Sequence, residues 1–188
     1  MVQFETERLA IRDWSEQFLA AFAEMNADPI VMRYFPSMLT PEESRTSMEY
    51  AIKATARHGF HLQPIVEKET GNFAGFVGLT RVEFDTHFTP AVEIGWRLPQ
   101  KYWGKGYAAE AARVFLDYGF RSLELAEIVS FTAKDNHRSR AVMARIGMTQ
   151  DVNGDFMHPD LNADHPLAHH VLYRIRRDGP CGPESEPG

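Results

Sequence analysis

The sequence has a single cysteine among its 188 residues, Cys181. A disulfide within the chain is therefore excluded, because it needs two cysteines. Cys181 lies in residues 178–188, a stretch rich in glycine, proline and glutamate that has almost no apolar surface to bury. Such a composition predicts a disordered tail, and a catalytic cysteine is not expected in it.

Long apolar runs are also missing. No stretch approaches the ~20 residues that a membrane-spanning helix needs. Residues 1–12 lack the basic lead and apolar run of a signal peptide. We therefore expect a cytoplasmic protein with no membrane partner.

An excess of basic residues is absent as well. The chain has 20 Lys and Arg against 26 Asp and Glu, a formal net charge of −6. Non-specific nucleic-acid binding needs a basic face, so no nucleic-acid partner is expected. A mildly acidic field favours a cationic ligand such as an amine, without identifying one.

What the chain does contain is enough apolar material for one hydrophobic core. Hydrophobic residues make up 44% of the sequence, and no linker divides it. This predicts a single globular domain over residues 1–177.

Hydrophobic periodicity predicts an α/β domain of the α+β kind, with a largely antiparallel first half. The order is strand, two helices, three strands, glycine loop, helix, strand, helix and two strands. Thr40 and Glu43 predict a capping box before Pro41, and Gly59 a helix stop. The segments that we place are strands at 4–13, 60–66, 73–84, 91–98, 128–133 and 169–175, and helices at 15–27, 41–58, 107–120 and 137–146.

Two local side-chain contacts are expected within these helices. Ser15 stands where its hydroxyl can cap the first helix. Glu110 and Arg113 are three residues apart on one helical face, close enough to pair.

The segment most suggestive of chemistry is the glycine loop before the third helix. Gly104 and Gly106 stand directly before Tyr107, the predicted first residue of that helix. A helix N-terminus carries unpaired N–H groups and a partial positive charge, and glycine lets a phosphate approach the backbone. The loop is therefore a credible anion cradle, with Lys101 and Lys105 adding positive charge beside it.

Three interpretations of this loop remain open on the residues alone. It can be a strand–helix turn without a ligand, a dinucleotide-binding fingerprint or an acyl-CoA pyrophosphate loop. Gly104, Gly106 and Ala109 satisfy G-x-G-x-x-A, but that fingerprint follows the first strand of a parallel unit, whereas the strands here are predicted antiparallel. A Walker phosphate loop is excluded, because Gly106 stands where Ser or Thr is required.

Three blocks of the sequence resemble the GNAT superfamily of N-acetyltransferases, above all the branch of Rim-type ribosomal-protein N-acetyltransferases. The resemblance spans roughly residues 6–175 and implies the GNAT fold. That fold is a mixed, mostly antiparallel sheet of six to seven strands with a splayed central parallel pair and about four helices. The blocks are EIGWRL at 93–98 with KYWGKGYAAEA at 101–111, Asn136 and Ser139 with RIGM at 145–148, and TERL at 6–9.

The resemblance implies an enzyme that transfers an acetyl group from acetyl-CoA, its co-substrate, to a primary amine. Backbone groups near Trp96 and Leu98 would pair with the pantetheine arm, and an N–H there would act as an oxyanion donor worth about 3 kcal/mol. One departure is Lys101, where the family often has Arg or Gln. The residues implied in acetyl-CoA binding are Trp96, Leu98, Lys101, Trp103, Gly104, Lys105, Gly106, Tyr107, Ala108 and Asn136.

The candidate catalytic residues are Glu93 and Ser139. Glu93 is placed to take a proton from the amine, but a strand carboxylate in solvent fits the same pattern. Ser139 would face the thiol end of the cofactor or be a solvated helix residue. Asn136 would contact the pantetheine arm, cap a helix, or both. Met143 stands where many family members carry a Tyr that protonates the leaving thiolate, so Ser139, water or the amine proton must serve.

The residues that would bind the acceptor are the hardest part of the site to predict from the sequence. The Asp- and His-rich stretch at 155–170 matches no standard metal-ligand spacing, so no metal is predicted; we expect it either to line the amine pocket or to form a solvated face. Trp14, Tyr34 and Phe35 are candidates for the opposite wall. The acceptor can be a protein N-terminus, a polyamine, an amino acid or an aminoglycoside. A homodimer is a family-level expectation, and a catalytically silent CoA-binding module remains the rival to an enzyme.

Overall fold

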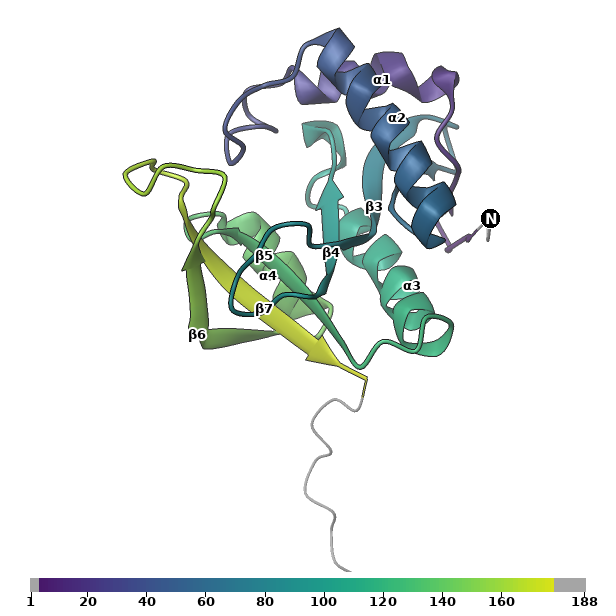
Figure 1. The fold of residues 1–188 in the computed structure, drawn as a ribbon. Helices are drawn as coiled ribbons and strands as arrows, with labels where there is room; N and C mark the ends of the chain where they lie inside the picture. Colours follow the sequence, from purple (N-terminus) through teal and green to yellow (C-terminus); the bar gives the residue numbers. More distant parts are fainter. Residues whose placement is uncertain (1–3, 178–188) are drawn as a thin grey trace, which may run out of the picture.

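The computed structural model describes residues 4–177, so the tail predicted at 178–188 lies outside the described residues (Figure 1). Four α-helices, two short 3-10 helices and seven strands follow one another in that span. In chain order they are β1 (Leu9–Ile11), η1 (Glu16–Phe18), α1 (Leu19–Asn26), α2 (Pro41–His58), β2 (Leu62–Glu67), β3 (Phe73–Arg81), β4 (Val92–Arg97), η2 (Gln100–Tyr102), α3 (Tyr107–Arg121), β5 (Glu127–Ala133), α4 (His137–Arg145), β6 (Thr149–Met157) and β7 (His169–Arg176).

The strands of the described residues form one mixed sheet in the order β1-β2-β3-β4-β5-β7-β6. Every neighbouring pair is antiparallel except β4 and β5, which are parallel. The predicted fold class is confirmed: the sheet is mostly antiparallel, its one parallel pair is central, and four α-helices accompany it.

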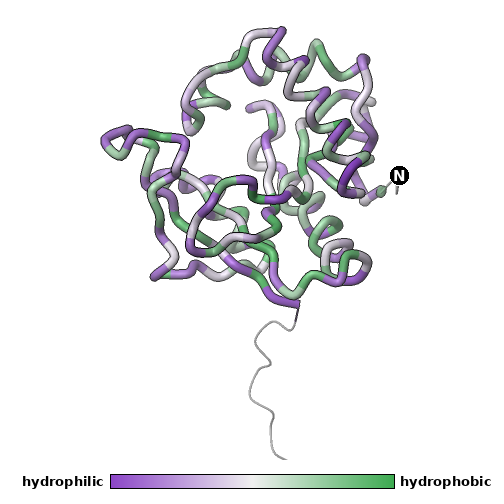
Figure 2. The backbone as a smooth tube through the Cα atoms, viewed as in Figure 1, coloured by the Kyte–Doolittle hydropathy of each residue, from purple (hydrophilic) through white to green (hydrophobic). Residues whose placement is uncertain are grey.

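Hydrophobic side chains pack on both faces of this sheet. One cluster joins α3, through residues such as Phe115, to the strands, and a second joins α1 and α2 to Phe73 and Phe76 of β3. Figure 2 shows the hydrophobic residues running along α3 and the central strands, while the tip of the β6–β7 connection is hydrophilic. The sheet is therefore the middle of three layers.

The alternation of β4 decides which of its side chains can serve a site. Ile94 has no exposed surface and belongs to the cluster under α3. Because successive strand residues point to opposite faces, Glu93, Gly95 and Arg97 share the other face. Arg97 reaches Asn26 of α1 from there.

The capping box and the glycine stop predicted for helix α2 are confirmed. The Thr40 hydroxyl accepts the Glu43 N–H at 3.2 Å, and the Glu43 carboxylate accepts the Thr40 N–H at 2.7 Å, with Pro41 directly after the cap. Gly59 ends the helix in the left-handed conformation at φ 82°. The local pattern was sufficient here because every partner lies within a few residues.

The expected cap by Ser15 is wrong. The segment opens with the 3-10 turn η1, the α-helix starts only at Leu19, and the Ser15 hydroxyl makes no capping hydrogen bond. Phe18 is buried against Trp14, at 6.5 Å between ring centroids, and its N–H donates to the Ser15 carbonyl. Packing of these aromatic rings tightens the first turn and overrides the local capping preference.

The first strand is shorter than the predicted 4–13. Only Leu9–Ile11 pair with β2, because residues 4–11 fold into a tight turn in which the Ile11 N–H donates to the Phe4 carbonyl. This turn keeps Thr6 and Arg8 beside the start of α3, where they make the contacts described below.

Candidate active site

The central parallel pair separates almost as soon as it forms. Glu93 and Val129 are the only paired residues of β4 and β5 within the described chain. The Ser130 hydroxyl also donates to the Ile94 carbonyl at 2.9 Å. Beyond it, Gly95 to Leu98 and Phe131 to Thr132 line opposite walls of a cavity of about 1050 Å³. The gap that the fold requires between these strands is present.

The glycine loop closes one end of this cavity. Gly104 and Gly106 adopt positive φ angles of 76° and 81°, which strain any other residue. The Trp103 N–H donates to the Gln100 carbonyl, but within residues 4–177 no protein acceptor is found for the N–H groups from Gly104 to Ala108. These amides, at the N-terminus of α3, are the donors that a diphosphate requires.

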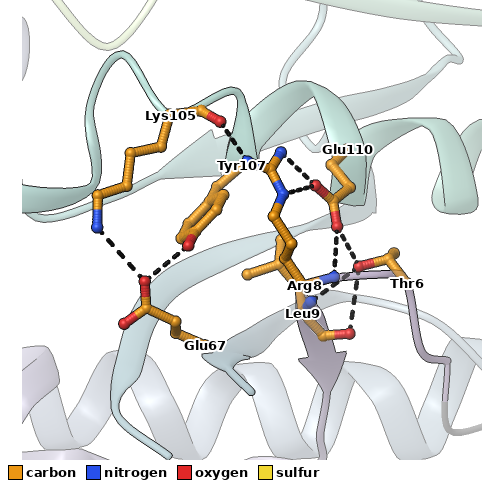
Figure 3. Close-up of polar contacts among 7 residues, drawn as sticks. All are labelled: Thr6, Arg8, Leu9, Glu67, Lys105, Tyr107 and Glu110. Carbon is orange, nitrogen blue, oxygen red and sulfur yellow. Dashed lines mark hydrogen bonds and ion pairs between the residues drawn. The ribbon is translucent and has the colours of Figure 1, made fainter. Parts of the chain in front are cut away.

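A polar network supports this loop from behind (Figure 3). Arg8 donates through Nη1 to the Lys105 carbonyl at 2.9 Å and through Nε to the Glu110 carboxylate at 2.8 Å. Glu110 also accepts the Arg8 N–H at 3.0 Å and the Thr6 hydroxyl. The N-terminal segment thus ties the loop to the first turn of α3.

This network corrects the expected pairing of Glu110 with Arg113. Glu110 turns to Arg8, whereas Arg113 donates to the Arg145 carbonyl at 2.9 Å. The carboxylate of Glu110 is much less exposed than a helix-surface pair would be, at 17% of its side-chain area. Arg8 gives Glu110 several charge-assisted hydrogen bonds, through its backbone N–H, Nε and Nη2, which a single ion pair with Arg113 would not supply.

The two predicted lysines do not line the cavity. Lys105 reaches Glu67, which also accepts the Tyr107 hydroxyl at 2.6 Å, and Lys101 lies over the ring of Tyr102. Figure 3 shows the Lys105 ammonium directed at Glu67. The predicted positive charge beside the loop therefore does not come from these side chains.

Two arginines of α4 take that place, and sequence reasoning missed both. Arg138 and Arg145 line the cavity, and the Arg138 guanidinium lies 4.3 Å from the centre of the Trp103 ring. Their helix is 30 residues beyond the loop in sequence. The available signal was the position of Arg138 in the first turn after the strand, beside the Asn136 and Ser139 block.

Glu93 lines the cavity just where β4 and β5 part. Burial raises the pKa of its carboxyl from 4.5 to about 8. A Cβ placed on Gly95 would be 3.8 Å from Glu93 Oε1, so the carboxylate leans over the space that this glycine leaves open. The neighbouring carboxylates Glu83 and Asp85 are not among the lining residues, and Glu83 accepts the Tyr50 hydroxyl at 2.6 Å.

Asn136 and Ser139 also line the cavity, from the end of β5 and the start of α4. The Asn136 side chain accepts the Ser139 N–H at 3.3 Å, which confirms it as a helix cap, and donates to Thr132 Oγ1 at 2.9 Å and Ser139 Oγ at 3.1 Å. Met143 lies buried on the same wall. Asn136 therefore holds α4 against the splayed end of β5.

Two connections between secondary-structure elements contribute to the cavity wall. Tyr34 and Phe35 line it from the α1–α2 connection, whereas Trp14 packs into the aromatic cluster instead. His158 and His170 line it from the β6–β7 side. Figure 1 shows both connections at the end of the sheet towards which β4 points.

The histidines on this wall are neutral at physiological pH. Burial lowers the pKa of His170 to about 4 and also lowers the pKa of His158. Among residues 4–177, no group of three or more His, Cys, Asp or Glu side chains is arranged to hold a metal ion. None of the helices described there is long and apolar enough to cross a membrane.

With this geometry in view, comparison with known proteins identifies the family. Residues 8–149 match the model of the acetyltransferase (GNAT) domain. The chain belongs to the GNAT acetyltransferase family. Its N-acetyltransferase relatives include an uncharacterized N-acetyltransferase YnaD of Bacillus subtilis, 31% identical over 146 residues that cover 78% of this chain and 82% of the relative.

Solved structures of GNAT proteins share the fold. A GNAT-family acetyltransferase from Bacillus anthracis superposes with a TM-score of 0.77 at 28% identity, covering 93% of this chain and 98% of that one. The ribosomal L7/L12 α-N-protein acetyltransferase RimL, in complex with coenzyme A, shares the fold alone, with a TM-score of 0.72 at 19% identity over 91% and 95% of the two chains.

The family settles the chemistry at a coarse level. This GNAT protein is an acetyl-CoA-dependent N-acetyltransferase that acts on an amine acceptor. The acyl-CoA interpretation of the glycine loop is the one that fits this family.

Proposed function

We propose that this enzyme acetylates a primary amine by direct attack on acetyl-CoA within a ternary complex, with Glu93 as the base. The observation that carries the proposal is the position of Glu93. Its carboxylate lies at the point where the parallel strands part, beside the open space over Gly95. An amine bound at this point would lie between the Glu93 carboxylate, which can accept its proton, and the free edge of β4, along which the thioester can bind.

The glycine loop and the main chain of β4 would bind the remaining parts of acetyl-CoA. The N–H groups from Gly104 to Ala108 would hold the diphosphate, with Arg138 and Arg145 adding charge. Main-chain groups between Trp96 and Leu98 would hold the pantetheine arm. In this proposal Lys105 contributes its backbone N–H, because its side chain is occupied by Glu67.

Buried Glu93 is suited to this proton transfer. An alkylamine has a pKa of about 10, and a base with a pKa of about 8 is far closer to it than an ordinary carboxylate. The amine nitrogen bonds to the acetyl carbon as the carbon–sulfur bond breaks. The ammonium loses one proton to the ionised Glu93 carboxylate before the attack. Its nitrogen gives up a second proton as the amide forms, and this proton passes to the thiolate, with the Ser139 hydroxyl placed to donate a hydrogen bond to the sulfur.

A thiol-release assay with acetyl-CoA and a panel of amines tests the proposal. In Glu93→Gln, kcat/KM should fall by roughly 10²–10⁴-fold, and the rise of the wild-type rate with pH towards about 8 should disappear. Glu83→Gln is the matched control, since that carboxylate bonds Tyr50 outside the cavity.

Three outcomes would contradict the proposal. An unchanged rate and pH profile in Glu93→Gln would remove Glu93 as the base. A trapped acetyl-enzyme would replace direct attack with a covalent route. Tight acetyl-CoA binding by calorimetry, without transfer to any amine, would point to a silent CoA-binding module.

A further inference from the structure

Arg97 is a half-buried cation that has no counter-ion among the described residues. It lines the cavity, and its Nη1 donates to Asn26 Oδ1 at 2.7 Å. Its Nε is buried without any hydrogen-bond partner. None of the ion pairs formed among residues 4–177 includes Arg97. Burial lowers its pKa to about 10, which still leaves it charged at neutral pH.

The guanidinium is held rigidly in this costly position. It lies 3.9 Å from the ring centre of Phe35 and 5.3 Å from that of Phe76, between two aromatic rings. Asn26, which has no exposed surface, is itself fixed by a 3.1 Å hydrogen bond to Ser44. An uncompensated buried charge is strongly unfavourable, so a group kept this way is a candidate for binding an anion from solution.

The acidic side chains on the cavity wall do not supply that anion. Glu93 is largely protonated at neutral pH, because burial raises its pKa to about 8. Asp160 is 77% exposed to solvent, 4.0 Å from the ring of His158, and forms no ion pair with Arg97. The site on Arg97 is thus left for a ligand.

Arg97 faces the acceptor end of the cavity. It shares a face of β4 with Glu93, four residues and roughly 13 Å of strand away, and it contacts Phe35 of the α1–α2 connection. The arginines near the glycine loop, Arg138 and Arg145, lie on α4 instead. An anion on Arg97 would therefore belong to the acceptor rather than to the phosphates of acetyl-CoA.

We propose that the acceptor is an amine that also carries a carboxylate, and that Arg97 binds this carboxylate while Glu93 receives the amine. The inference rests on the proposed function and deepens it. Since Nη1 is engaged and Nε is shielded, the guanidinium offers a single edge, which suits a small monovalent anion better than a phosphate. Of the four acceptor classes open from the sequence, this favours amino acids and acidic N-terminal peptides over polyamines and aminoglycosides.

Paired acceptors test this assignment directly. Each pair differs in one carboxylate: phenylalanine and phenethylamine, γ-aminobutyrate and propylamine, and two peptide amides with glutamate or glutamine as the second residue. Acetyl transfer is measured with the wild type, Arg97→Met and Arg97→Lys. Arg33→Gln is the control, because Arg33 also lines the cavity but bonds the Tyr34 hydroxyl.

The wild type should prefer the carboxylate member of at least one pair by roughly ten- to a hundredfold in kcat/KM. The pair that shows this preference identifies whether the carboxylate belongs to an α-amino acid, an ω-amino acid or a peptide. Arg97→Met should lose the preference, Arg97→Lys should keep part of it as a point charge, and Arg33→Gln should keep all of it. The acetyl-CoA Kd should stay within about twofold in every variant.

Equal use of both members in all three pairs would overturn the inference, as would a preference that survives in Arg97→Met. A loss of acetyl-CoA affinity in that variant would assign Arg97 to the donor instead. If Arg97→Met does not fold, Arg97→Lys carries the test.

Binding measurements distinguish a failure of this inference from a failure of the proposed function. If no amine is acetylated, calorimetry with the three carboxylate-bearing acceptors and the CoA-saturated protein still decides. Binding that Arg97→Met abolishes would support the carboxylate site while the transfer proposal fails, and no binding to the wild type would remove the site as well.

Discussion

The burial of Glu93 links catalysis to stability at the scale of one residue. Its folded-state pKa of about 8 lies above the value of 4.5 for an exposed glutamate. The folded state therefore holds a proton that the unfolded state releases, and the free energy of unfolding falls as pH rises from about 4.5 to about 8. The stabilisation is complete below that window and is lost above it.

Glu93→Gln should remove this pH dependence. Relative to the wild type, the variant should gain on the order of a few kcal/mol in unfolding free energy between pH 5 and pH 9, since an amide does not ionise. Urea unfolding at the two pH values measures the difference. A stability difference that is the same at both values would show that Glu93 is not desolvated in the folded protein.

The space over Gly95 gives a second test at the residue scale. A Cβ there would lie 3.6 Å from Leu62 Cδ2 and 3.8 Å from Glu93 Oε1, which are ordinary contact distances. Gly95→Ala should therefore fold with a Tm close to that of the wild type. It should lower kcat/KM for the amine by roughly tenfold, because one methyl group occupies the acceptor space, while acetyl-CoA affinity is retained. Unchanged kinetics would place the amine elsewhere.

At the scale of elements, the turn at residues 6–9 and helix α3 act together on the glycine loop. Arg8 joins the Lys105 carbonyl to Glu110, so the loop conformation depends on a residue about a hundred positions earlier. The Arg8 side chain is 45% exposed, which limits the energy of the pair itself. Its effect should therefore be on loop geometry more than on global stability.

Glu110→Gln should weaken acetyl-CoA binding by roughly three- to tenfold, because Arg8 loses its charged partner and the loop amides are less well oriented. The kcat at saturating acetyl-CoA should change by less than about twofold. Asp117→Asn is the matched control, since Asp117 pairs with Arg121 on the exposed face of the same helix. Equal effects of the two substitutions on the Kd would rule out a specific role for the network.

The capping box of α2 belongs to the same scale and concerns stability alone. Thr40→Ala removes the hydroxyl that accepts the Glu43 N–H. It should lower the free energy of unfolding by about 1 kcal/mol, measured by urea unfolding. Thr46→Ala, which removes an exposed hydroxyl bonded to the Glu42 carbonyl, is the comparison. A change in acetyl-CoA affinity is not expected from either.

At the scale of the whole molecule, the two halves of the sheet, β1 to β4 and β5 to β7, are connected by a very short stretch of strand pairing. Strands β4 and β5 pair only at Glu93 and Val129 within the described chain, supported by the Ser130 hydroxyl. The cavity walls come from both sides of this join. A ligand bound between the two cavity walls should therefore connect the two sides of the sheet.

Acetyl-CoA should accordingly stabilise the entire domain. At a concentration of 100 times its Kd, mass action adds about 2.7 kcal/mol to the free energy of unfolding, which thermal unfolding detects as a concentration-dependent rise in Tm. Hydrogen exchange should slow most at Gly95 to Leu98 and at Gly104 to Ala108. Protection confined to other segments would contradict the placement of the cofactor.

Much of this architecture could be predicted from the sequence. The helix at 41–58 and the hairpin of β2 and β3 followed from capping residues and alternation, and the glycine loop before α3 followed from two glycines that need positive φ. Each of these signals acts between near neighbours along the chain. The failed cap of Ser15 marks the limit, since buried aromatic packing decides that turn.

The site was predictable only in part. Gly104, Gly106 and Asn136 line the cavity, but the cations that line it are arginines rather than the two lysines beside the loop: Arg33, Arg97, Arg138 and Arg145. A lysine in or beside the glycine loop can point away from the cavity, whereas an arginine from a distant segment of the chain can line it. Spacing along the chain does not contain that information.

The sequence by itself therefore determined the order of the elements, the ends of α2 and the left-handed conformation of the two loop glycines, because short-range sterics and hydrogen bonds control all three. Only the tertiary structure decided that Glu93 is desolvated, that Glu110 pairs with Arg8, and that Arg97 has no counter-ion among the described residues. Burial and charge compensation depend on which distant segments meet in space, and that is settled only when the whole sheet has assembled.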